Sequence, residues 1–189
     1  GYIGYYAGSA GTVTVDGTDA TWNDSSHLSV GYQGGGTLNI TGGGLVANDY
    51  GYIGDQAGST GTVSVGDRST WANRGSVVVG HYGAGTLHLT TGGAIQNGYG
   101  SIGYRGGSTG TATVDGAGAT WTNTGGLQVG EYGAGTLGIT NGGSVSNTTG
   151  HIGRVAAASG AVTVSGADST WTNTSSLYIG GSSTAAGGT

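Results

Sequence analysis

The sequence predicts an all-β fold: a right-handed parallel β-helix that takes up residues 1–189 as a single solenoid array of about seven and a half coils. Three observations predict it. A repeat of about 25 residues runs through the chain, each repeat holds three short segments of alternating apolar and polar residues, and glycine-rich turns separate the segments. Each strand is expected to pair in parallel with its equivalents about 4.8 Å above and below. Such coiling favours a right-handed path.

The repeat is visible at two periods. The four tryptophans are separated by 49, 50 and 50 residues, which gives double-coil repeats beginning near residues 1, 51, 100 and 150. A finer repeat is marked by seven glycines, six of them followed by threonine, in steps of 25, 25, 24, 25, 25 and 25 residues. These glycines are Gly11, Gly36, Gly61, Gly85, Gly110, Gly135 and Gly160. A repeat this regular predicts coils that stack in register.

Each unit contains three alternating segments, for example LQVG, GTLGI and SVSN. Alternation with a period of two indicates strands with one inward face, and these segments are too short for an ordinary helix. The second segment supplies two inward apolar residues per coil, which we expect to form the core. The pairs are Val13/Val15, Leu38/Ile40, Val63/Val65, Leu87/Leu89, Ala112/Val114, Leu137/Ile139 and Val162/Val164.

The composition is unusual for a folded protein. Glycine supplies 47 of 189 residues and only 34% are hydrophobic, which alone would indicate disorder. The high charge typical of disorder is missing, since the chain has four basic and nine acidic residues. A solenoid reconciles these facts, because only the inward row of each strand must be apolar and the backbone ladders supply much of the cohesion.

Charge and composition also exclude several functions. With four arginines, no lysine and a pI near 4.9, the chain has no cationic surface for nucleic acid or anionic lipid. No apolar run approaches the ~20 residues of a membrane-spanning helix, so we expect no direct membrane insertion of this segment. The absence of cysteine removes disulfides, thiolate metal sites and thiol catalysis. We expect no cofactor.

The four tryptophans are expected to be structural. They alternate with Val46, Ile95 and Val145 in successive coils, while the first inward position of the first strand alternates in the opposite sense. Coils with tryptophan have glycine there, and the others have leucine or valine. An inward ring would fill the space that the missing side chain leaves, and the alternative is a ring that covers the outside. The tryptophans are Trp22, Trp71, Trp121 and Trp171; the glycines are Gly1, Gly51, Gly100 and Gly150; the aliphatic residues are Leu28, Val77, Leu127 and Leu177.

A polar column stands two residues after each tryptophan or its aliphatic counterpart. We interpret it as a structural ladder at the third turn, in which amide side chains hydrogen-bond from coil to coil and asparagine tolerates left-handed backbone. The alternative is a set of glycan acceptors, since some members satisfy the N-x-S/T pattern. The column consists of Asp24, Asn48, Asn73, Asn97, Asn123, Asn147 and Asn173.

The ionisable residues do not predict catalysis. Asp16 and Asp115 occupy equivalent positions four coils apart, about 19 Å by the stacking distance, which is too far to share a substrate. Three opposite-charge pairs fall on neighbouring coils, and we interpret them as exposed pairs that contribute ~0–1 kcal/mol each. They are Asp55 with His81, Glu131 with Arg154, and Asp49 with Arg74.

Metal binding is not expected either. Histidine ligands would have to converge on one site, whereas the four histidines occupy unrelated columns. They are His27, His81, His88 and His151.

Two outward surfaces are candidates for binding. The first is a ligand-facing stripe of aromatic and charged residues in the turn after the first strand, suited to glycan or protein recognition. The alternative is that the tyrosines only stack along the edge and shield the turn backbone. The stripe consists of Tyr5, Tyr6, Tyr32, Tyr82, Tyr104, Arg105, Glu131, Tyr132 and Arg154.

The second surface is the outward row of the second strand, where threonines form ranks that resemble ice-binding faces. His88 and Gly138 interrupt the second rank, which disfavours a regular ice-binding lattice. The first rank holds Thr12, Thr37, Thr62, Thr86, Thr111 and Thr136; the second holds Thr14, Asn39, Ser64, His88, Thr113, Gly138 and Thr163.

The motifs STWTNTSSLYIG, GEYGAGTLGITNGGSVSN and GSTGTVSV resemble the strand-loop-strand repeats in passenger regions of Gram-negative autotransporters, the type V secretion proteins, including large adhesins of the AIDA kind. The resemblance covers nearly the whole chain. It implies a right-handed β-helix on the outer cell surface of a Gram-negative bacterium or released outside it. The resemblance does not indicate a ligand, and the partners that the aromatic stripe suggests are glycans or proteins of a host or neighbouring cell.

The leading functional expectation is a non-enzymatic stalk or adhesin segment that presents or spaces a binding surface. Both ends look cut mid-coil, because Gly1 begins at a first strand and Gly188 begins an eighth unit after the insertion SSTAA. Open strand edges invite self-association, end to end or edge to edge, so the chain could instead be a fibre subunit. An ice-binding solenoid and a β-helix enzyme acting on polysaccharide are the remaining two functions that the sequence leaves open.

Overall fold

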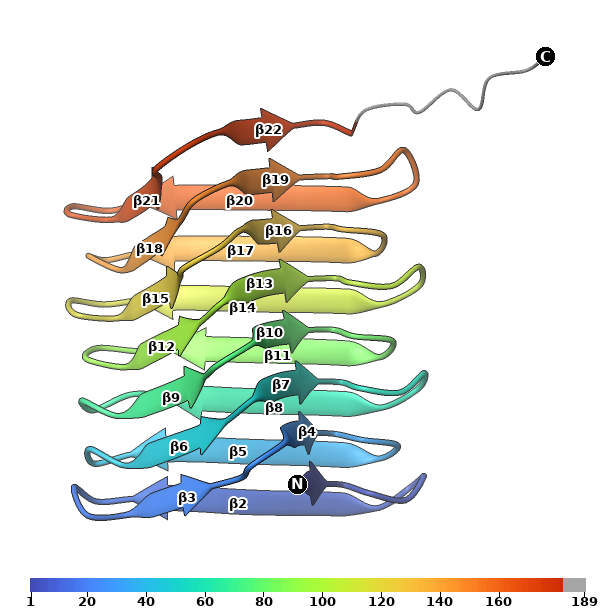
Figure 1. Ribbon diagram of the computed structural model, residues 1–189, viewed down its shortest axis with the longest axis vertical. Helices are drawn as coiled ribbons and strands as arrows, with labels where there is room; N and C mark the ends of the chain where they lie inside the picture. The colour runs from blue at the N-terminus through green and yellow to red at the C-terminus, as the bar shows by residue number, and fades with distance from the viewer. Residues whose placement is uncertain (182–189) are drawn as a thin grey trace.

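A computed structural model describes residues 1–181, and they form a β-solenoid of three parallel sheets that extend along the whole stack (Figure 1). In Figure 1 the nearer strands run from left to right and the farther strands return from right to left as the chain climbs, which is a right-handed path. The predicted fold is therefore confirmed. The insertion and the proposed eighth unit, residues 182–189, lie outside the described residues.

Sheet A is made of the first strand of every coil, and its eight strands follow one another in chain order. They are β1 (Tyr2–Ile3), β4 (His27–Val30), β7 (Tyr50–Ile53), β10 (Ser76–Val79), β13 (Tyr99–Ile102), β16 (Leu127–Val129), β19 (Gly150–Ile152) and β22 (Leu177–Ile179).

Sheet B contains the longest strands, and sheet C contains the strands on which the tryptophans lie. The strands of sheet B are β2 (Ala10–Asp16), β5 (Gly35–Thr41), β8 (Thr60–Val65), β11 (Ala84–Leu89), β14 (Thr109–Asp115), β17 (Ala134–Thr140) and β20 (Ser159–Ser165). Those of sheet C are β3 (Thr21–Asn23), β6 (Leu45–Asn48), β9 (Thr70–Asn73), β12 (Ala94–Asn97), β15 (Thr120–Asn123), β18 (Ser144–Asn147) and β21 (Thr170–Asn173).

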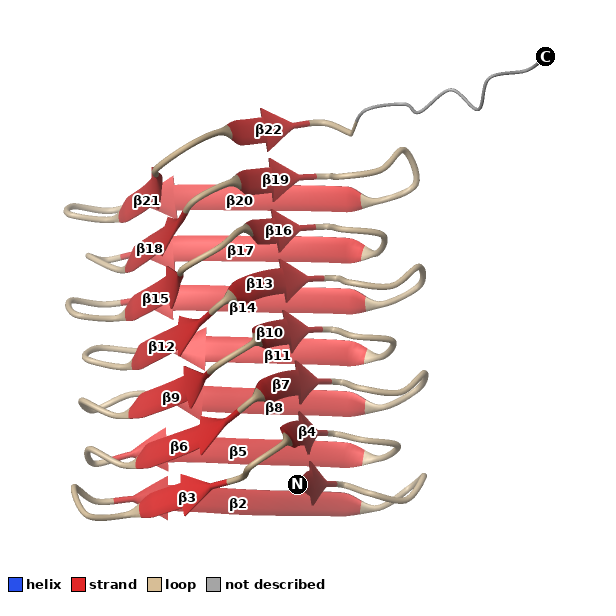
Figure 2. Cartoon of the chain, in the orientation of Figure 1, coloured by secondary structure: helices blue, strands red, loops and turns tan. Residues whose placement is uncertain are grey.

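The three sheets give each coil a flattened outline. Figure 2 shows sheet B along one side, with sheets C and A sharing the other side and loops joining the two sides. All of the regular structure within residues 1–181 is strand, so this part of the chain has no helix that could cross a membrane.

The core lies between these layers, and equivalent residues stack directly above one another. Val63, Leu87 and Ala112 occupy one position in three successive coils, and all three are fully buried. The predicted inward pairs are confirmed in the interior of the stack. In the last coil Val162 is only half-buried and Val164 is exposed, because among the described residues no further strand of sheet B covers them.

A glycine with left-handed backbone follows each strand of sheet A, and this turn explains much of the glycine content. Gly103, for example, has φ 71°. A Cβ on Gly110, at the start of the next strand, would lie 2.6 Å from the Gly103 amide nitrogen and 2.8 Å from Ile102 Cγ2. The turn thus packs backbone against backbone, and only glycine fits both positions.

The tryptophan rings point inward, as one of the two alternatives predicted. Trp71 and Trp121 are fully buried, and Trp22 and Trp171 are half-buried in the first and last full coils. A Cβ on Gly51 would lie 2.5 Å from Cζ2 of Trp71, so the ring occupies the space that a larger residue would need. The interpretation of the rings as an outer cover is wrong, and the double repeat is a pair of complementary coils.

The asparagines hydrogen-bond from coil to coil, as predicted, but they do so in separate groups and not along the whole column. The indole N–H of Trp121 donates to Asn97 Oδ1 in the coil below (2.7 Å), and Asn97 Nδ2 donates to Asn123 Oδ1 in the coil above (2.7 Å). The same bonds join Trp71 to Asn48 and Asn73, and Trp171 to Asn147 and Asn173. Each group ends where the next coil has no indole, and the buried Nδ2 of Asn73 has no partner there.

The expectation of left-handed backbone in this column also needs correction. Its asparagines end extended strands, and the non-glycine residues with positive φ in residues 1–181 lie elsewhere, at Asp67, Arg68, Asn141 and Asp168. Asp24 does not join a group, since its carboxylate accepts the backbone N–H of Ser26 (3.1 Å). Asn147 is buried and its amide donates to Asn173, so the folded chain hides it from glycan attachment.

We predict that Trp121→Ala lowers the free energy of unfolding by about 3–5 kcal/mol, because it leaves a large cavity opposite Gly100 and strips Asn97 of a donor. Urea denaturation followed by circular dichroism measures the loss. Trp22→Ala is the matched control, with a smaller loss expected from its half-buried ring. A loss below about 1 kcal/mol for Trp121→Ala would contradict the role of this ring in the core.

Candidate functional site

The outward face of sheet A gathers aromatic side chains from coils far apart in sequence. Because side chains alternate along a strand, the residues that face outward form columns parallel to the solenoid axis. One column contains Tyr2, Ser29, Tyr52, Val78, Ser101, Gln128, His151 and Tyr178. A second column, two residues earlier in each coil, contains His27, Tyr50, Ser76 and Tyr99.

Two tyrosines of the second column lie flat on the backbone of the next coil. A Cβ on Gly75 would lie 2.8 Å from Cδ1 of Tyr50, and a Cβ on Gly125 would lie 2.5 Å from Cε1 of Tyr99. The inner face of each ring is therefore supported by glycine, while Tyr50 remains 47% exposed and Tyr99 61% exposed. The two rings occupy equivalent positions in successive double repeats.

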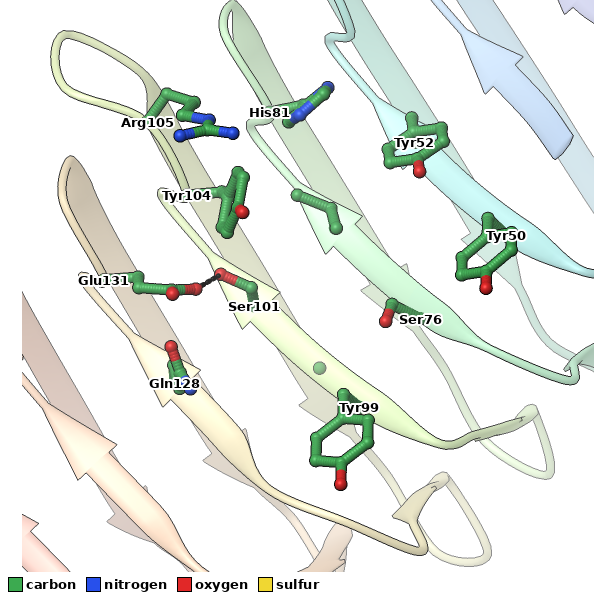
Figure 3. Close-up of a pocket in the computed structure, with 12 residues that line it drawn as sticks. Tyr50, Tyr52, Ser76, His81, Tyr99, Ser101, Tyr104, Arg105, Gln128 and Glu131 are labelled. Carbon is green, nitrogen blue, oxygen red and sulfur yellow. Dashed lines mark hydrogen bonds between the residues drawn. The ribbon is translucent and has the colours of Figure 1, made fainter.

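A groove of about 400 Å³ lies between these tyrosines (Figure 3). It forms because β10 presents the smaller residues Ser76 and Val78, whereas β7 and β13 on either side present tyrosine. Four tyrosines wall the groove, and small or polar residues of three coils form its floor. The walls are Tyr50, Tyr52, Tyr99 and Tyr104, and the floor is Ser76, Val78, Ser101 and Gln128.

A buried acid lies beside the groove on the side of β7. Asp55 is only 5% exposed, and its carboxylate accepts the Ser29 hydroxyl (2.6 Å) and contacts Nδ1 of His81 (2.7 Å). The pair with His81 was predicted, but its interpretation as an exposed pair is wrong. Burial, and next the nearby Asp55 carboxylate, raise the pKa of Tyr52.

A second buried acid lies under the other end of the groove. Glu131 is 7% exposed and accepts the Ser101 hydroxyl (3.0 Å) and Nη1 of Arg154 (2.7 Å). With its amide in the orientation that satisfies hydrogen bonding, Gln128 also donates to this carboxylate (2.7 Å). Burial raises the pKa of Glu131, while Ser101 and Arg154 act in the opposite direction. This pair is therefore partly buried, with the acid covered and 40% of the Arg154 side chain exposed.

The third predicted pair is exposed, as expected. Arg74 donates to Asp49 at 3.2 Å with 87% of its side chain in solvent.

The predicted stripe is not one continuous surface. Tyr5, Tyr6 and Tyr32 form a cluster with Tyr2 near the first coil, with ring centroids of Tyr5 and Tyr32 5.2 Å apart. Asp55 then takes the place of an aromatic residue and interrupts the row. The remaining members form one group above it, in which Tyr82, Tyr104 and Arg105 connect to Glu131, Tyr132 and Arg154 through the rings of Tyr104 and Tyr132, whose centroids are 6.3 Å apart.

The arginines of the stripe lie over tyrosine rings. Cζ of Arg105 is 4.6 Å from the ring centroid of Tyr104 and 5.5 Å from that of Tyr82, and Cζ of Arg154 is 5.9 Å from that of Tyr132. These contacts hold the guanidinium groups at the turn, beside the end of the groove. The alternative in which the tyrosines stack along the edge is thus correct for part of the stripe.

The sequence pattern predicted the turn residues on this side of the solenoid and not the groove residues on the strands of sheet A. These groove residues are Tyr50, Tyr52, Ser76, Val78, Tyr99, Ser101 and Gln128. The signal was present, since YGYI at residues 50–53 and YGSI at residues 99–102 place tyrosine at outward positions beside inward glycine and isoleucine.

The site has no arrangement that activates a nucleophile. Ser29 and His81 both bind Asp55, whereas a serine nucleophile would have to bind the histidine directly. Asp55 and Glu131 lie three coils apart, about 14 Å by the stacking distance, which is beyond the separation of a glycosidase carboxylate pair. Within residues 1–181, no three histidine or acidic side chains gather as metal ligands would.

Comparison of the chain with protein-family models, with curated proteins and with solved structures gives no match.

We predict that Arg154→Ala lowers the free energy of unfolding by about 1–2 kcal/mol at pH 7, because it leaves the buried Glu131 charge without its cation. Glu131 has a raised pKa in the fold, so its contribution to stability is present below pH 4.5 and is lost as the pH rises through the folded pKa. The effect of the substitution should therefore vanish near pH 4, where Glu131 is protonated. Urea denaturation at both pH values measures it.

Arg74→Ala is the control for this experiment, because its exposed pair with Asp49 should contribute at most about 0.5 kcal/mol at either pH. An equal loss for Arg154→Ala at pH 4 and pH 7 would show that the arginine acts by packing and not through Glu131.

Proposed function

We propose that the chain is a non-enzymatic segment of a surface-displayed or secreted bacterial protein, a stalk with an adhesive face. The observation that carries this proposal is the unbroken register of the three sheets, which repeat the same residue positions in every coil. A stack of this kind fixes the orientation of one coil relative to the next. It therefore spaces its two ends rigidly while it presents side chains along its length.

Two features support an extracellular setting. The motifs resemble the passenger repeats of autotransporters, which implies exposure at or beyond the outer surface of a Gram-negative bacterium. The chain also lacks cysteine, a composition that fits export as an unfolded chain.

The face of sheet A supports the adhesive part of the proposal. Its exposed tyrosines and the groove between them point away from the axis, so a partner reaches them while the stack continues above and below. Exposed aromatic side chains with polar neighbours are typical of recognition surfaces. The partners of this proposal are glycans or proteins of a host or neighbouring cell.

If the chain is a stalk, added coils should lengthen it without changing its cross-section. A variant with residues 50–98 duplicated after Gly98 should be monomeric and about 10 Å longer than the parent chain with an unchanged cross-section, since it gains two coils. Small-angle X-ray scattering and analytical ultracentrifugation of both proteins measure length and mass. Concentration-dependent fibres in electron micrographs would favour the fibre subunit instead, and an unchanged length would exclude the stalk.

One specific observation favours ice binding: a column of threonines stacks in register on the outward face of sheet B. Thr62, Thr86 and Thr111 stand directly above one another, while His88 breaks the second rank and binds Thr113 through Nδ1 (2.9 Å). We predict no thermal hysteresis for this protein in nanolitre osmometry. Hysteresis that Thr86→Tyr abolishes would favour the ice-binding function over the adhesive stalk.

A further inference from the structure

We infer that the groove on sheet A binds a neutral, extended oligosaccharide whose chain runs along the solenoid axis, with one sugar ring on Tyr50 and another on Tyr99. This inference rests on the proposed adhesive function and specifies its ligand. The binding depends on the two ring platforms, their spacing, the hydrogen-bonding groups between them and the charge beneath them.

The platforms are suited to sugar rings because they are flat, fixed and exposed on one face. Each tyrosine ring is backed by the glycine of the next coil, Gly75 or Gly125, so it cannot sink into the surface and is ordered before a ligand arrives. The C–H groups on one face of a pyranose are weakly positive and pack on the negative face of an aromatic ring. Figure 3 shows both rings at the surface, on either side of Ser76.

The spacing matches a chain that lies along the axis. Tyr50 and Tyr99 belong to β7 and β13, which are two coils apart, so the rings are separated by about 10 Å. Each sugar unit of an extended chain advances the chain by a distance comparable with the stacking distance between neighbouring coils. Two stacked units can therefore be joined by one unit that lies over Ser76 and Val78.

The floor of the groove offers hydrogen-bond partners for hydroxyl groups. Gln128 and Ser101 both donate to Glu131, which leaves the amide oxygen of Gln128 and the hydroxyl oxygen of Ser101 as acceptors. Ser76 lies between the platforms, and its hydroxyl both donates and accepts (Figure 3). Sugar hydroxyls donate to such acceptors, whereas a carboxylate or sulfate has no proton to donate.

The charge around the groove favours a neutral ligand. The acids at its two ends are already paired, Asp55 with His81 and Glu131 with Arg154, so their partners are not free to bind an anion, and the acceptors of the floor disfavour an anionic sugar. Arg105 is the arginine that lines the groove, but its guanidinium lies over Tyr104 at the turn and not between the two platforms. An acidic glycan is therefore the rival that the experiment has to distinguish.

The extent of the site follows from the sequence of the double repeat. The position of Tyr50 and Tyr99 is occupied by Thr149 in the following double repeat, so the pair of platforms is not continued. The site thus spans the coils of β7, β10, β13 and β16 and takes a short stretch of a longer chain.

The test uses isothermal titration calorimetry of the full chain with soluble hexasaccharides. The neutral probes are those of β-1,4-linked glucose and β-1,4-linked N-acetylglucosamine, and the acidic probe is hexagalacturonic acid. We expect at least one neutral probe to bind with a Kd of about 0.01–1 mM. Tyr50→Ala and Tyr99→Ala should each weaken binding about tenfold, while Tyr50→Phe should retain it because the ring platform remains.

Two further variants make the result specific. Ser76→Tyr should abolish binding, because the larger side chain fills the floor between the platforms. The fold should be retained, since position 76 faces outward and the core is unchanged. Tyr6→Ala removes an exposed ring outside the groove and should leave binding as it is. Circular dichroism melting of every variant shows whether the fold is retained.

Several results would overturn the inference. They are no binding of either neutral probe at millimolar concentration, binding that survives Ser76→Tyr, or tighter binding of hexagalacturonic acid that Arg105→Ala abolishes. These failures are separate from failure of the stalk, because the length of the duplicated variant does not depend on any ligand.

Discussion

Parallel backbone pairing in strict register is the constraint on which the rest of this structure depends. Each residue of sheets A, B and C pairs with the residue at the same position one coil away, so any side chain is repeated or replaced directly above itself. Because of this stacking, each side chain lies between the equivalent side chains of the coils above and below, and the core consists of columns along the solenoid axis. The thin apolar interior, the aromatic groove and the buried charges are all arrangements of such columns.

The interior shows how a column can change while the register is kept. In every second coil a tryptophan on sheet C packs against a glycine on sheet A, and in the coils between them a smaller aliphatic residue on sheet C is matched by leucine or valine on sheet A, so that both kinds of coil fill the interior. The indole N–H then binds the asparagine of the coil below, and the amide of that asparagine reaches the coil above. The hydrogen-bonded groups of asparagines therefore repeat every two coils, as the tryptophans do, and not in every coil.

The fold was predictable from the sequence because it depends on periodicity, and periodicity survives without three-dimensional information. The coil length, the three strands and the inward pairs followed from repeats such as Gly85-Thr86 and Gly110-Thr111. The site was predicted only in part, because burial of Asp55 and Glu131 depends on how the side chains of neighbouring coils pack around them. The platform role of Tyr50 also depends on its ring orientation over Gly75, which spacing alone does not determine.

The left-handed glycine after each strand of sheet A fixes the path of the chain, and the two residues that follow it bear no such burden. In successive coils they read Tyr-Tyr, Tyr-Gln, Asp-Gln, His-Tyr, Tyr-Arg, Glu-Tyr and Arg-Val, on turns that alternate between a longer form, as from Gly4 to Gly11, and a shorter form, as from Gly31 to Gly36. Each coil thus presents its own pair of side chains after the same left-handed glycine. Substitutions at these two positions can therefore change the outward surface of a coil while the path of the backbone is kept.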